Sequence, residues 1–221
     1  MLELNAGTGI DAVYFACQGI NVLATDNSDG MLDRLSQKAS DLKLEEMITV
    51  RNCSFLELNK LQGSTFDYIF SDFGGLNCTP DLQPVLESFN HLLKPGGFAT
   101  LVIMPPVCPW EILSLFKGNS KLAFRRFKRD GAESLVEGIG FKTYYFKPSE
   151  LIKSFGKQYE RMKLQGLGSV SPPPYKSQFA VKFPSVYSAL IRTESRLSEY
   201  FPFNSWADHF ILTMKRKQSI H

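Results

Sequence analysis

The chain has 221 residues, of which 43% are hydrophobic and 21% charged, so it can bury a full core as one domain, or as one domain with an insertion. It lacks the run of about 20 apolar residues that a membrane-spanning helix needs, and we expect a soluble, cytoplasmic protein. Four cysteines without a C-x-x-C pair and three histidines exclude a disulfide framework and predict no metal site.

Charge is unevenly distributed along the chain, although the net charge is only +3. Residues 1–104 hold 6 Lys/Arg against 13 Asp/Glu, whereas residues 105–221 hold 19 against 9. A basic C-terminal half attracts anionic substrates or surfaces through its summed field. The same split also arises from solvated faces alone, so both interpretations stay open.

The first hundred residues alternate short apolar runs with amphipathic ones, which is typical of βα units around a parallel sheet. The pattern predicts strands at Met1–Asn5, Val22–Thr25, Ile48–Arg51, Phe66–Ser71 and Phe98–Met104, and helices at Ile10–Gln18, Asp29–Ser40 and Pro80–Leu93. Pro95-Gly96-Gly97 predicts a tight turn before the fifth strand, because Pro cannot continue a helix and Gly permits the reversal.

The regular βα spacing stops after Met104. A basic amphipathic run from Glu111 to Arg129 and an aromatic segment Phe141–Phe146 follow, and we expect a cap over the sheet there. A helix at Ser149–Phe155 and strands at Tyr159–Leu164 and His209–Lys215 complete the expected elements, the final strand forming an antiparallel edge.

These elements predict an α/β fold, a Rossmann-like doubly wound sheet of seven mostly parallel strands with an antiparallel last strand and a cap insertion. We divide the chain into a cofactor-binding core (1–104), a cap and substrate-binding insertion with a late strand (105–182), and a C-terminal part of the core sheet (183–221).

A glycine-rich segment, Glu3-Leu4-Asn5-Ala6-Gly7-Thr8-Gly9, follows the first strand and opens the first helix. Its glycines let the backbone approach a ligand, and the helix N-terminus presents free N–H groups. Asp26 ends the second strand, where a carboxylate accepts both hydroxyls of a ribose. A nucleotide-like cofactor is implied, and Gly7-x-Gly9-x-x-Ala12 fits a nicotinamide dinucleotide as well.

Three ordered motifs resemble those of class I S-adenosylmethionine-dependent methyltransferases: the glycine loop, Asp26 with the run Asn27-Ser28-Asp29-Gly30-Met31-Leu32, and the PGG turn. Cys108-Pro109-Trp110-Glu111 and Ala207-Asp208-His209-Phe210 are similar to a bacterial subgroup of small-molecule methyltransferases, distantly similar to ubiquinone and menaquinone biosynthesis enzymes. The resemblance implies S-adenosylmethionine as cofactor, held by Glu3, Asn5, Ala6, Gly7, Gly9, Asp26, Asn27, Met31, Cys53, Ser54, Phe55, Ser71 and Phe73. Met31 fits a core position equally well, and Cys53 a small buried side chain.

Asp72, Glu111 and His209 are candidates for catalysis, because a carboxylate or imidazole takes a proton from a hydroxyl or phenol. Methyl transfer is an in-line displacement that alignment alone promotes, so no base is obligatory. Glu111 also fits a helix N-terminal carboxylate, and His209 a structural histidine beside Asp208.

The predicted substrate-binding residues are Asn77, Trp110, Arg125 and Arg126, which lie among aromatic side chains in the sequence. They predict a small, largely apolar acceptor methylated on oxygen or carbon, although the aromatics fit the core of the cap as well. The cationic run Lys117–Arg129 predicts either peripheral contact with a membrane or lipid, or a helix packed on the domain. We expect no nucleic-acid partner, because the Asp/Asn-Pro-Pro-aromatic grip for a flipped base is missing.

Two other functions stay open, and the oligomeric state is not predicted. An NAD(P)-dependent oxidoreductase shares the glycine loop. A cofactor-binding protein without activity is the other, because in this family a segment normally precedes the first strand and closes the pocket, whereas this chain begins inside that strand.

Overall fold

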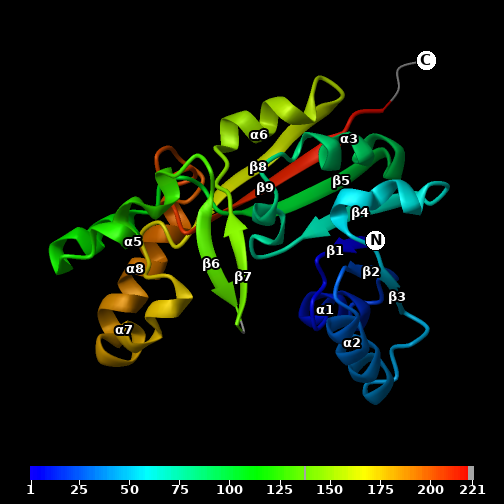
Figure 1. Ribbon diagram of the computed structural model, residues 1–221, viewed down its shortest axis with the longest axis horizontal. Coiled ribbons are helices and arrows are strands. Elements are labelled where there is room, and N and C mark those ends of the chain that lie inside the picture. The colour runs from blue at the N-terminus through cyan, green and yellow to red at the C-terminus, as the bar shows by residue number, and fades with distance from the viewer. Residues whose placement is uncertain (137, 219–221) are drawn as a thin grey trace.

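A seven-stranded sheet runs through the molecule in the order β3-β2-β1-β4-β5-β9-β8 (Figure 1). The computed structural model describes residues 1–136 and 138–218. β1 to β5 are parallel, and β9 is antiparallel to both of its neighbours, which confirms the predicted fold. The strands are β1 (Leu2–Leu4), β2 (Val22–Asp26), β3 (Ile48–Asn52), β4 (Phe66–Ser71), β5 (Leu93–Ile103), β8 (Tyr159–Leu167) and β9 (His209–Arg216).

The last strand does not form the edge, which corrects our expectation. β9 lies between β5 and β8, with Leu212 paired to Leu101 on one side and to Leu164 on the other. β9 has no exposed residue, as expected for an interior strand. β8 instead exposes the charged run Glu160–Lys163, and such charges keep an edge strand from pairing with another chain.

β5 begins at Leu93, five residues earlier than predicted, and takes the PGG segment into the strand. The pairing with β4 shifts register between Phe66 and Tyr68. A Cβ at Gly97 would lie 2.8 Å from the Asp67 carbonyl oxygen. The cluster is therefore an irregular strand start that needs close backbone approach, and not a separate turn.

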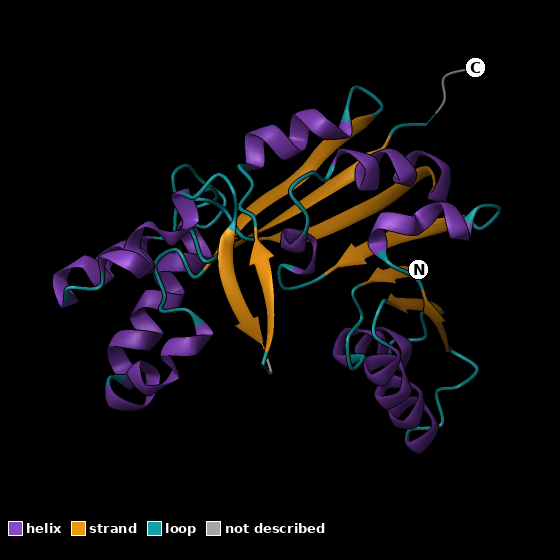
Figure 2. Cartoon of the chain, viewed as in Figure 1, coloured by secondary structure: helices purple, strands orange, loops and turns teal. Residues whose placement is uncertain are grey.

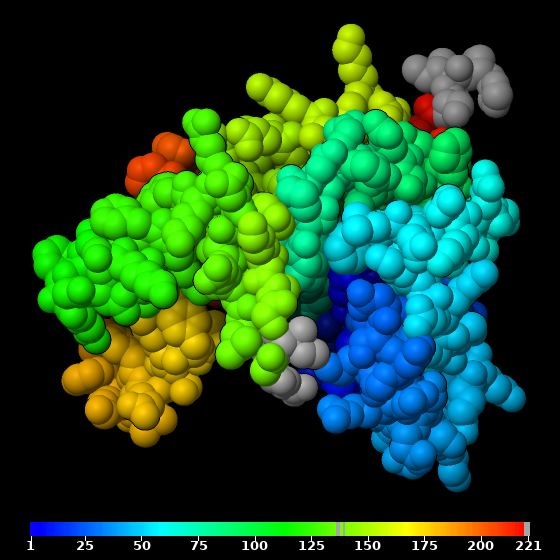
Figure 3. Space-filling view, viewed as in Figure 1, coloured from blue at the N-terminus to red at the C-terminus, as the bar shows by residue number. Residues whose placement is uncertain are grey.

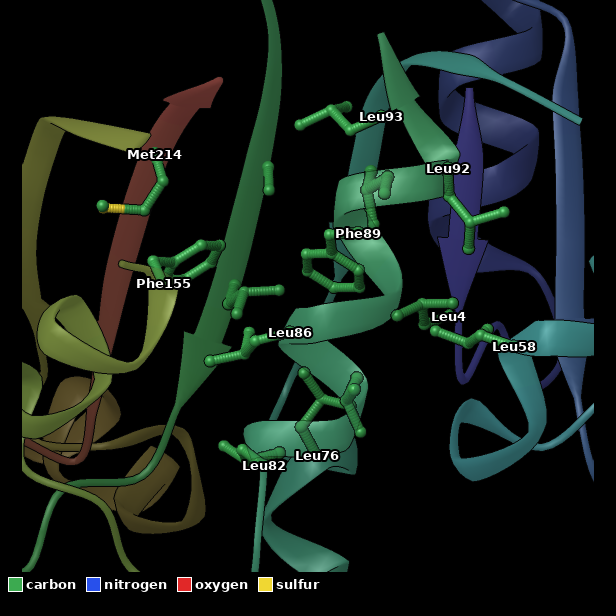
Figure 4. Close-up of a cluster of buried hydrophobic side chains, with 14 of the residues drawn as sticks. Leu4, Leu58, Leu76, Leu82, Leu86, Phe89, Leu92, Leu93, Phe155 and Met214 are labelled. Carbon is green, nitrogen blue, oxygen red and sulfur yellow. The ribbon is translucent and has the colours of Figure 1, made fainter. Parts of the chain in front are cut away.

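One face of the sheet is covered by α3 (Gln83–Leu92), α6 (Pro148–Phe155) and the 3₁₀ segment η1 (Phe55–Leu61). α3 buries Val85, Leu86, Phe89 and Leu92, spaced as one apolar helix face. Phe89 also packs against Phe155, with ring centroids 6.2 Å apart (Figure 4). This cluster is the main core and fixes β4 and β5, whose ends lead into the site.

The other face is covered at its N-terminal half by α1 (Ile10–Cys17) and α2 (Asp29–Asp41). Small buried residues on these helices, among them Ala12, Ala16 and Ala39, pack against β2 and β3. Because alanines permit close approach, the N-termini of both helices lie directly beside the strand ends that precede them.

The segments after β5 and after β8 gather at one end of the sheet, with the antiparallel β6–β7 ribbon standing apart from the main sheet (Figure 2). The single helix expected for the cationic run 117–129 is broken, because Gly118 takes a left-handed φ of 73° and Asn119 caps a new helix. None of the described helices is long and apolar enough to cross a membrane. The elements here are α4 (Pro109–Ile112), η3 (Leu113–Lys117), α5 (Ser120–Phe124), η4 (Arg125–Phe127), β6 (Ala132–Val136), β7 (Ile139–Thr143), η5 (Pro174–Lys176), α7 (Ser177–Lys182) and α8 (Pro184–Leu197); η2 (Gly75–Cys78) follows β4.

Candidate cofactor and acceptor site

The loops that follow β1, β2, β3, β4 and β5 meet at one edge of the sheet, because the carboxyl ends of parallel strands lie together. β9 is antiparallel, so its first residue, His209, lies at this edge as well, next to the end of β5. In Figure 3 the surface is hollowed between the blue N-terminal segment and the yellow-green β6–β7 ribbon. The predicted site residues come from these loops.

The glycine loop places its two glycines in different surroundings. Gly9 has a φ of 74°, and a Cβ there would lie 2.0 Å from Leu35 Cδ1 on α2. Gly7 has a φ of 53°, yet a Cβ there would meet nothing within 4 Å. Packing therefore requires glycine at Gly9, whereas the backbone at Gly7 is open to a ligand.

Asp26 is tied to the glycine loop by hydrogen bonds. Its Oδ2 accepts the Gly7 N–H at 3.0 Å, and its Oδ1 accepts the Ser28 N–H at 3.0 Å. Lys38 supports the same loop by donating from Nζ to the Thr8 carbonyl at 2.7 Å. The carboxylate is half-buried and fixed in position, and each oxygen keeps a lone pair for a further donor.

Glu3 on β1 is 2% exposed, and its Oε2 has no hydrogen-bond partner among the described residues. Burial, reinforced by the charges of Asp11 and Asp72, raises the pKa of Glu3 to about 8. Burial likewise raises the pKa of Asp72 to about 6, with Asp11 adding to the shift. Burial and like charges thus disfavour the ionised forms of Glu3 and Asp72, and a cationic ligand group would favour them.

Asn5 and Ser71 lie side by side at the ends of β1 and β4, with Asn5 Nδ2 3.3 Å from Ser71 Oγ. A Cβ at Gly75 would lie 2.6 Å from that amide nitrogen, so the backbone after β4 approaches β1 closely. Ala6 is buried in the same loop, and its N–H donates to the Thr25 carbonyl at 3.0 Å. The structure brings Asn5, Ala6 and Ser71 together at this edge of the sheet.

The predicted site residues that follow β3 take mainly structural positions, and those that follow β2 differ in exposure. Ser54 caps η1 by accepting the Leu56 N–H at 3.2 Å, and Phe55 packs against the main core. Cys53 is 2% exposed, and burial raises the pKa of its thiol, which fits a small structural side chain. Met31 is partly buried, whereas Asn27 is exposed beside Asp26.

His209 forms a pair with Asp208 at the start of β9. Its Nδ1 lies 3.0 Å from Asp208 Oδ2, and its ring packs edge-on against Phe73 with centroids 5.6 Å apart. Asp208 Oδ1 accepts from Arg126 Nη2 at 2.7 Å. Burial opposes ionisation of Asp208, but the His209 hydrogen bond and the Arg126 charge lower its pKa below the usual value. Asp208 is a site residue that sequence reasoning named only as the neighbour of His209.

Glu111 is committed to two arginines. It is 2% exposed and accepts from Arg125 Nε at 2.8 Å and from Arg126 Nη2 at 2.7 Å. Burial disfavours its charged form, yet the two guanidinium groups hold its pKa below the usual value. We therefore assign Glu111 a structural role, because a paired, stably ionised carboxylate is a poor proton acceptor.

Arg126 is 4% exposed and also donates to the backbone carbonyls of Pro105 and Asp208, at 3.1 and 2.8 Å. Among the described residues, one cluster has side chains of the types that bind metals close together: Cys108, Glu111 and Asp208. The Arg126 guanidinium binds both carboxylates of this cluster. Arg126 thus supplies the positive charge that these carboxylates need, and because it is bound to them it is not directed to a substrate.

Asn77 and Trp110 also take structural positions. Asn77 is fully buried: its Nδ2 donates to the carbonyls of Met104 and Tyr144, and its Oδ1 accepts the Met104 N–H. Trp110 packs on Phe179, with ring centroids 6.3 Å apart, and lies under the Lys176 ammonium. The amide of Asn77 is used up by backbone groups, so it holds the cap on the sheet.

Two cavities adjoin Phe73, which is 65% exposed. One, of about 380 Å³, is mainly apolar, and the other, of about 540 Å³, opens toward Arg125 and the β6–β7 ribbon. The smaller cavity is lined by residues including Phe73, Gly168, Pro173, Lys176, Tyr187 and His209. An acceptor in it would lie against His209.

Residues 1–97 match a family model described as a methyltransferase domain. No curated protein matches the sequence. The chain is similar to a solved SAM-dependent methyltransferase from Methanosarcina mazei, with 15% identity over 99% of this chain and 92% of the other and a TM-score of 0.66. It is also similar to the CcbJ methyltransferase from Streptomyces caelestis, with 17% identity over 97% and 87% and a TM-score of 0.61.

A third similar structure is geranyl diphosphate C-methyltransferase from Streptomyces coelicolor in complex with S-adenosyl-L-homocysteine, with 13% identity over 97% of this chain and 70% of the other and a TM-score of 0.59. Residues 1–97 are thus similar to a methyltransferase domain, and the fold is the one these proteins share. Both comparisons point to S-adenosylmethionine-dependent methyltransferases as the proteins that this chain resembles.

Proposed function

We propose that the protein transfers a methyl group from S-adenosylmethionine to a small, largely apolar acceptor, at oxygen or carbon. The observation that carries the proposal is the buried Glu3 carboxyl group, whose Oε2 finds no hydrogen-bond partner in the described part of the chain, together with the open backbone of Gly7. A buried acceptor without a donor costs about 1–3 kcal/mol, so a ligand that supplies the donor is favoured there.

The cofactor fits this arrangement group by group. Asp26 would accept the ribose hydroxyls with its free lone pairs, and Glu3 and Asp72 would balance the positive charge of the methionine part. Asn5, Ala6 and Ser71 would line the methionine part, with the remaining loop residues toward the adenine. When bound, S-adenosylmethionine supplies an activated methyl group on a sulfonium; the residues of this chain bind, align and exclude water.

The acceptor is proposed to lie in the apolar cavity of about 380 Å³ beside Phe73 and His209. Its lining by prolines, Leu167 and Tyr187 favours an apolar molecule, which agrees with the distant similarity to quinone biosynthesis enzymes inferred from the sequence. Residues 105–182, with α8 beyond them, supply much of this lining, so we propose that they act as the substrate-binding cap.

We also propose that the exposed face around α5 makes peripheral contact with anionic lipid. Phe116 is 89% exposed and Phe124 54%, beside the exposed cations Lys117 and Lys121. Apolar and basic side chains on one face favour an anionic lipid surface. Sedimentation with phosphatidylserine vesicles, and its loss in Phe116→Ser, is the expected result.

Isothermal titration calorimetry with four ligands separates the remaining alternatives. We expect S-adenosylmethionine and S-adenosylhomocysteine to bind and NAD⁺ and NADP⁺ not to bind. Binding of a dinucleotide in their place would support the oxidoreductase. Binding of S-adenosylmethionine without transfer of a tritiated methyl group to any apolar acceptor would support a cofactor-binding protein without activity.

A further inference from the structure

His209 lines the apolar cavity, and one of its two ring nitrogens is bound by a neighbouring side chain. Its Nδ1 is taken by Asp208 Oδ2 at 3.0 Å, and the described residues offer Nε2 no hydrogen-bond partner. Nε2 lies 3.5 Å from the position that a Cβ at Gly74 would take, so the ring sits against bare backbone. The side chain is 14% exposed and lines the cavity with Phe73 and Lys176.

Asp208 is built to hold this ring in one orientation. Its side chain is 9% exposed, and Arg126 keeps it ionised through a hydrogen bond of 2.7 Å to the other oxygen, Oδ1. Arg126 is in turn fixed by Glu111 at 2.7 Å. An ionised carboxylate at Nδ1 requires a proton on that nitrogen, which leaves Nε2 of the neutral ring with its lone pair free.

Charged groups face His209 from several elements of the fold. Asp208 faces it from its own strand, and Asp72 from the loop after β4. Lys176, in η5, shares the cavity and opposes a positive ring, while Arg126 is neutralised by Glu111 and Asp208. The lowered pKa of Lys176, caused mainly by burial, weakens that opposition.

We propose that His209 is the general base of the methyl transfer, positioned by Asp208, and that the acceptor carries a hydroxyl group, so that the product is a methyl ether. This inference rests on the proposed function and names its acceptor class. The acceptor O–H proton passes to Nε2, the oxygen forms a bond to the methyl carbon, and the carbon–sulfur bond breaks. S-adenosylhomocysteine leaves, and the imidazolium releases its proton to solvent.

The ring tautomer tests the positioning without any acceptor. The chain has three histidines, so ¹⁵N-labelled imidazole resonances can be assigned by His209→Gln and by His91→Gln on the exposed side of α3. We expect neutral His209 to carry its proton on Nδ1, with Nε2 bare. A proton on Nε2 in the neutral ring would overturn the proposal.

Two phenols test the chemistry. In the presence of S-adenosylmethionine we expect wild type to methylate phenol and 4-nitrophenol. His209→Gln should lower kcat/KM for phenol about 100-fold, which is the usual effect of removing a general base. It should leave kcat/KM for 4-nitrophenol nearly unchanged, because this phenol ionises unaided at pH 8. His91→Gln should change neither, and all three proteins should bind S-adenosylhomocysteine equally.

An equal loss for both phenols in His209→Gln would show a role in packing and overturn the proposal. Failure of wild type to methylate either phenol while S-adenosylhomocysteine still binds would also overturn it, and would leave the proposed function standing. Failure to bind S-adenosylhomocysteine would instead contradict the proposed function itself.

Discussion

Arg126 and Glu111 form an ion pair of 2.7 Å in which both side chains are almost completely buried, at 3% and 2% exposure. Because Arg126 also binds Asp208, the pair joins α4 of the cap to the start of β9. Removing one partner leaves a buried charge without compensation. We expect Arg126→Leu to lower the free energy of unfolding in urea by about 3–5 kcal/mol.

Arg129→Ala is the matched control, since that side chain is exposed a few residues along the same segment. It should change the free energy of unfolding by no more than about 0.5 kcal/mol. If both variants unfold at the same urea concentration, the buried network does not join the cap to the sheet.

Glu3 makes stability depend on pH. Its folded pKa of about 8 lies above the ordinary value of 4.5, so between these values the unfolded chain has released a proton that the folded chain keeps. The unfolded state then binds fewer protons, and the stability that Glu3 contributes falls as pH rises from about 4.5 to about 8. Relative to Glu3→Gln, wild type should lose on the order of 4 kcal/mol across this range.

Urea unfolding at pH 4.5, 6 and 8 measures this difference. Glu46→Gln, an exposed residue before β3, serves as the control and should follow wild type at each pH. If the free energy of unfolding changes with pH in the same way for wild type and Glu3→Gln, Glu3 is ionised in the folded protein near pH 5.

The two loop glycines separate packing from binding. Gly9→Ala brings a methyl group to 2.0 Å from Leu35 Cδ1, and we expect a loss of about 1–3 kcal/mol in stability from overpacking. Gly7→Ala meets open space and costs about 1–2 kcal/mol for its positive φ. Gly7→Ala should nevertheless lose S-adenosylhomocysteine affinity, because its methyl group occupies the ligand's space. Thermal unfolding with and without ligand measures both effects, and a Gly7→Ala protein that binds as tightly as wild type contradicts this placement.

Glu194 on α8 holds the loop that forms one wall of the apolar cavity. Its carboxylate accepts the N–H groups of Gly168, Val170 and Ser171 at 2.9, 2.9 and 2.7 Å. Glu194→Gln removes one acceptor oxygen, so we expect faster amide hydrogen exchange in this loop and a loss of about 1–3 kcal/mol. Cofactor affinity should stay constant, and KM for the acceptor should rise.

Glu199→Gln provides the comparison, because Glu199 lies in an exposed pair with Lys163 at 3.1 Å. Exposed pairs contribute little, so exchange at 168–171 should not change. Equal protection of the loop in all three proteins would show that Glu194 does not hold it.

The sequence predicts the part of the site whose residues lie close together in the chain. The glycine loop, Asp26 and the turn into α2 lie within 31 residues, and their geometry follows from φ angles and strand ends that a motif encodes. The interior place of β9 had a signal too, because β9 alternates buried apolar residues whereas β8 carries a charged run. The PGG segment was misplaced because it also permits an irregular strand start.

The sequence carries no comparable signal for the buried network of Glu111, Arg126 and Asp208. Glu111 and Arg126 are 15 residues apart, and Arg126 and Asp208 are 82 apart, so only tertiary packing brings them together. From sequence, Arg125 and Arg126 therefore seemed available to a substrate, and Glu111 to a proton. The structure shows instead that these charges neutralise one another, and Arg125 also reaches a cavity.

Calorimetric titration of S-adenosylhomocysteine into wild type and Asp26→Ala tests the central claim most directly. Asp26 lies at the end of β2 with both oxygens fixed by the N–H groups of Gly7 and Ser28, and we propose that it accepts the ribose hydroxyls. The variant should bind more than about tenfold more weakly, because charge-assisted hydrogen bonds are lost, while Asp33→Ala on the exposed side of α2 binds as wild type. Equal affinity of Asp26→Ala and wild type, or no binding by wild type, would contradict the account.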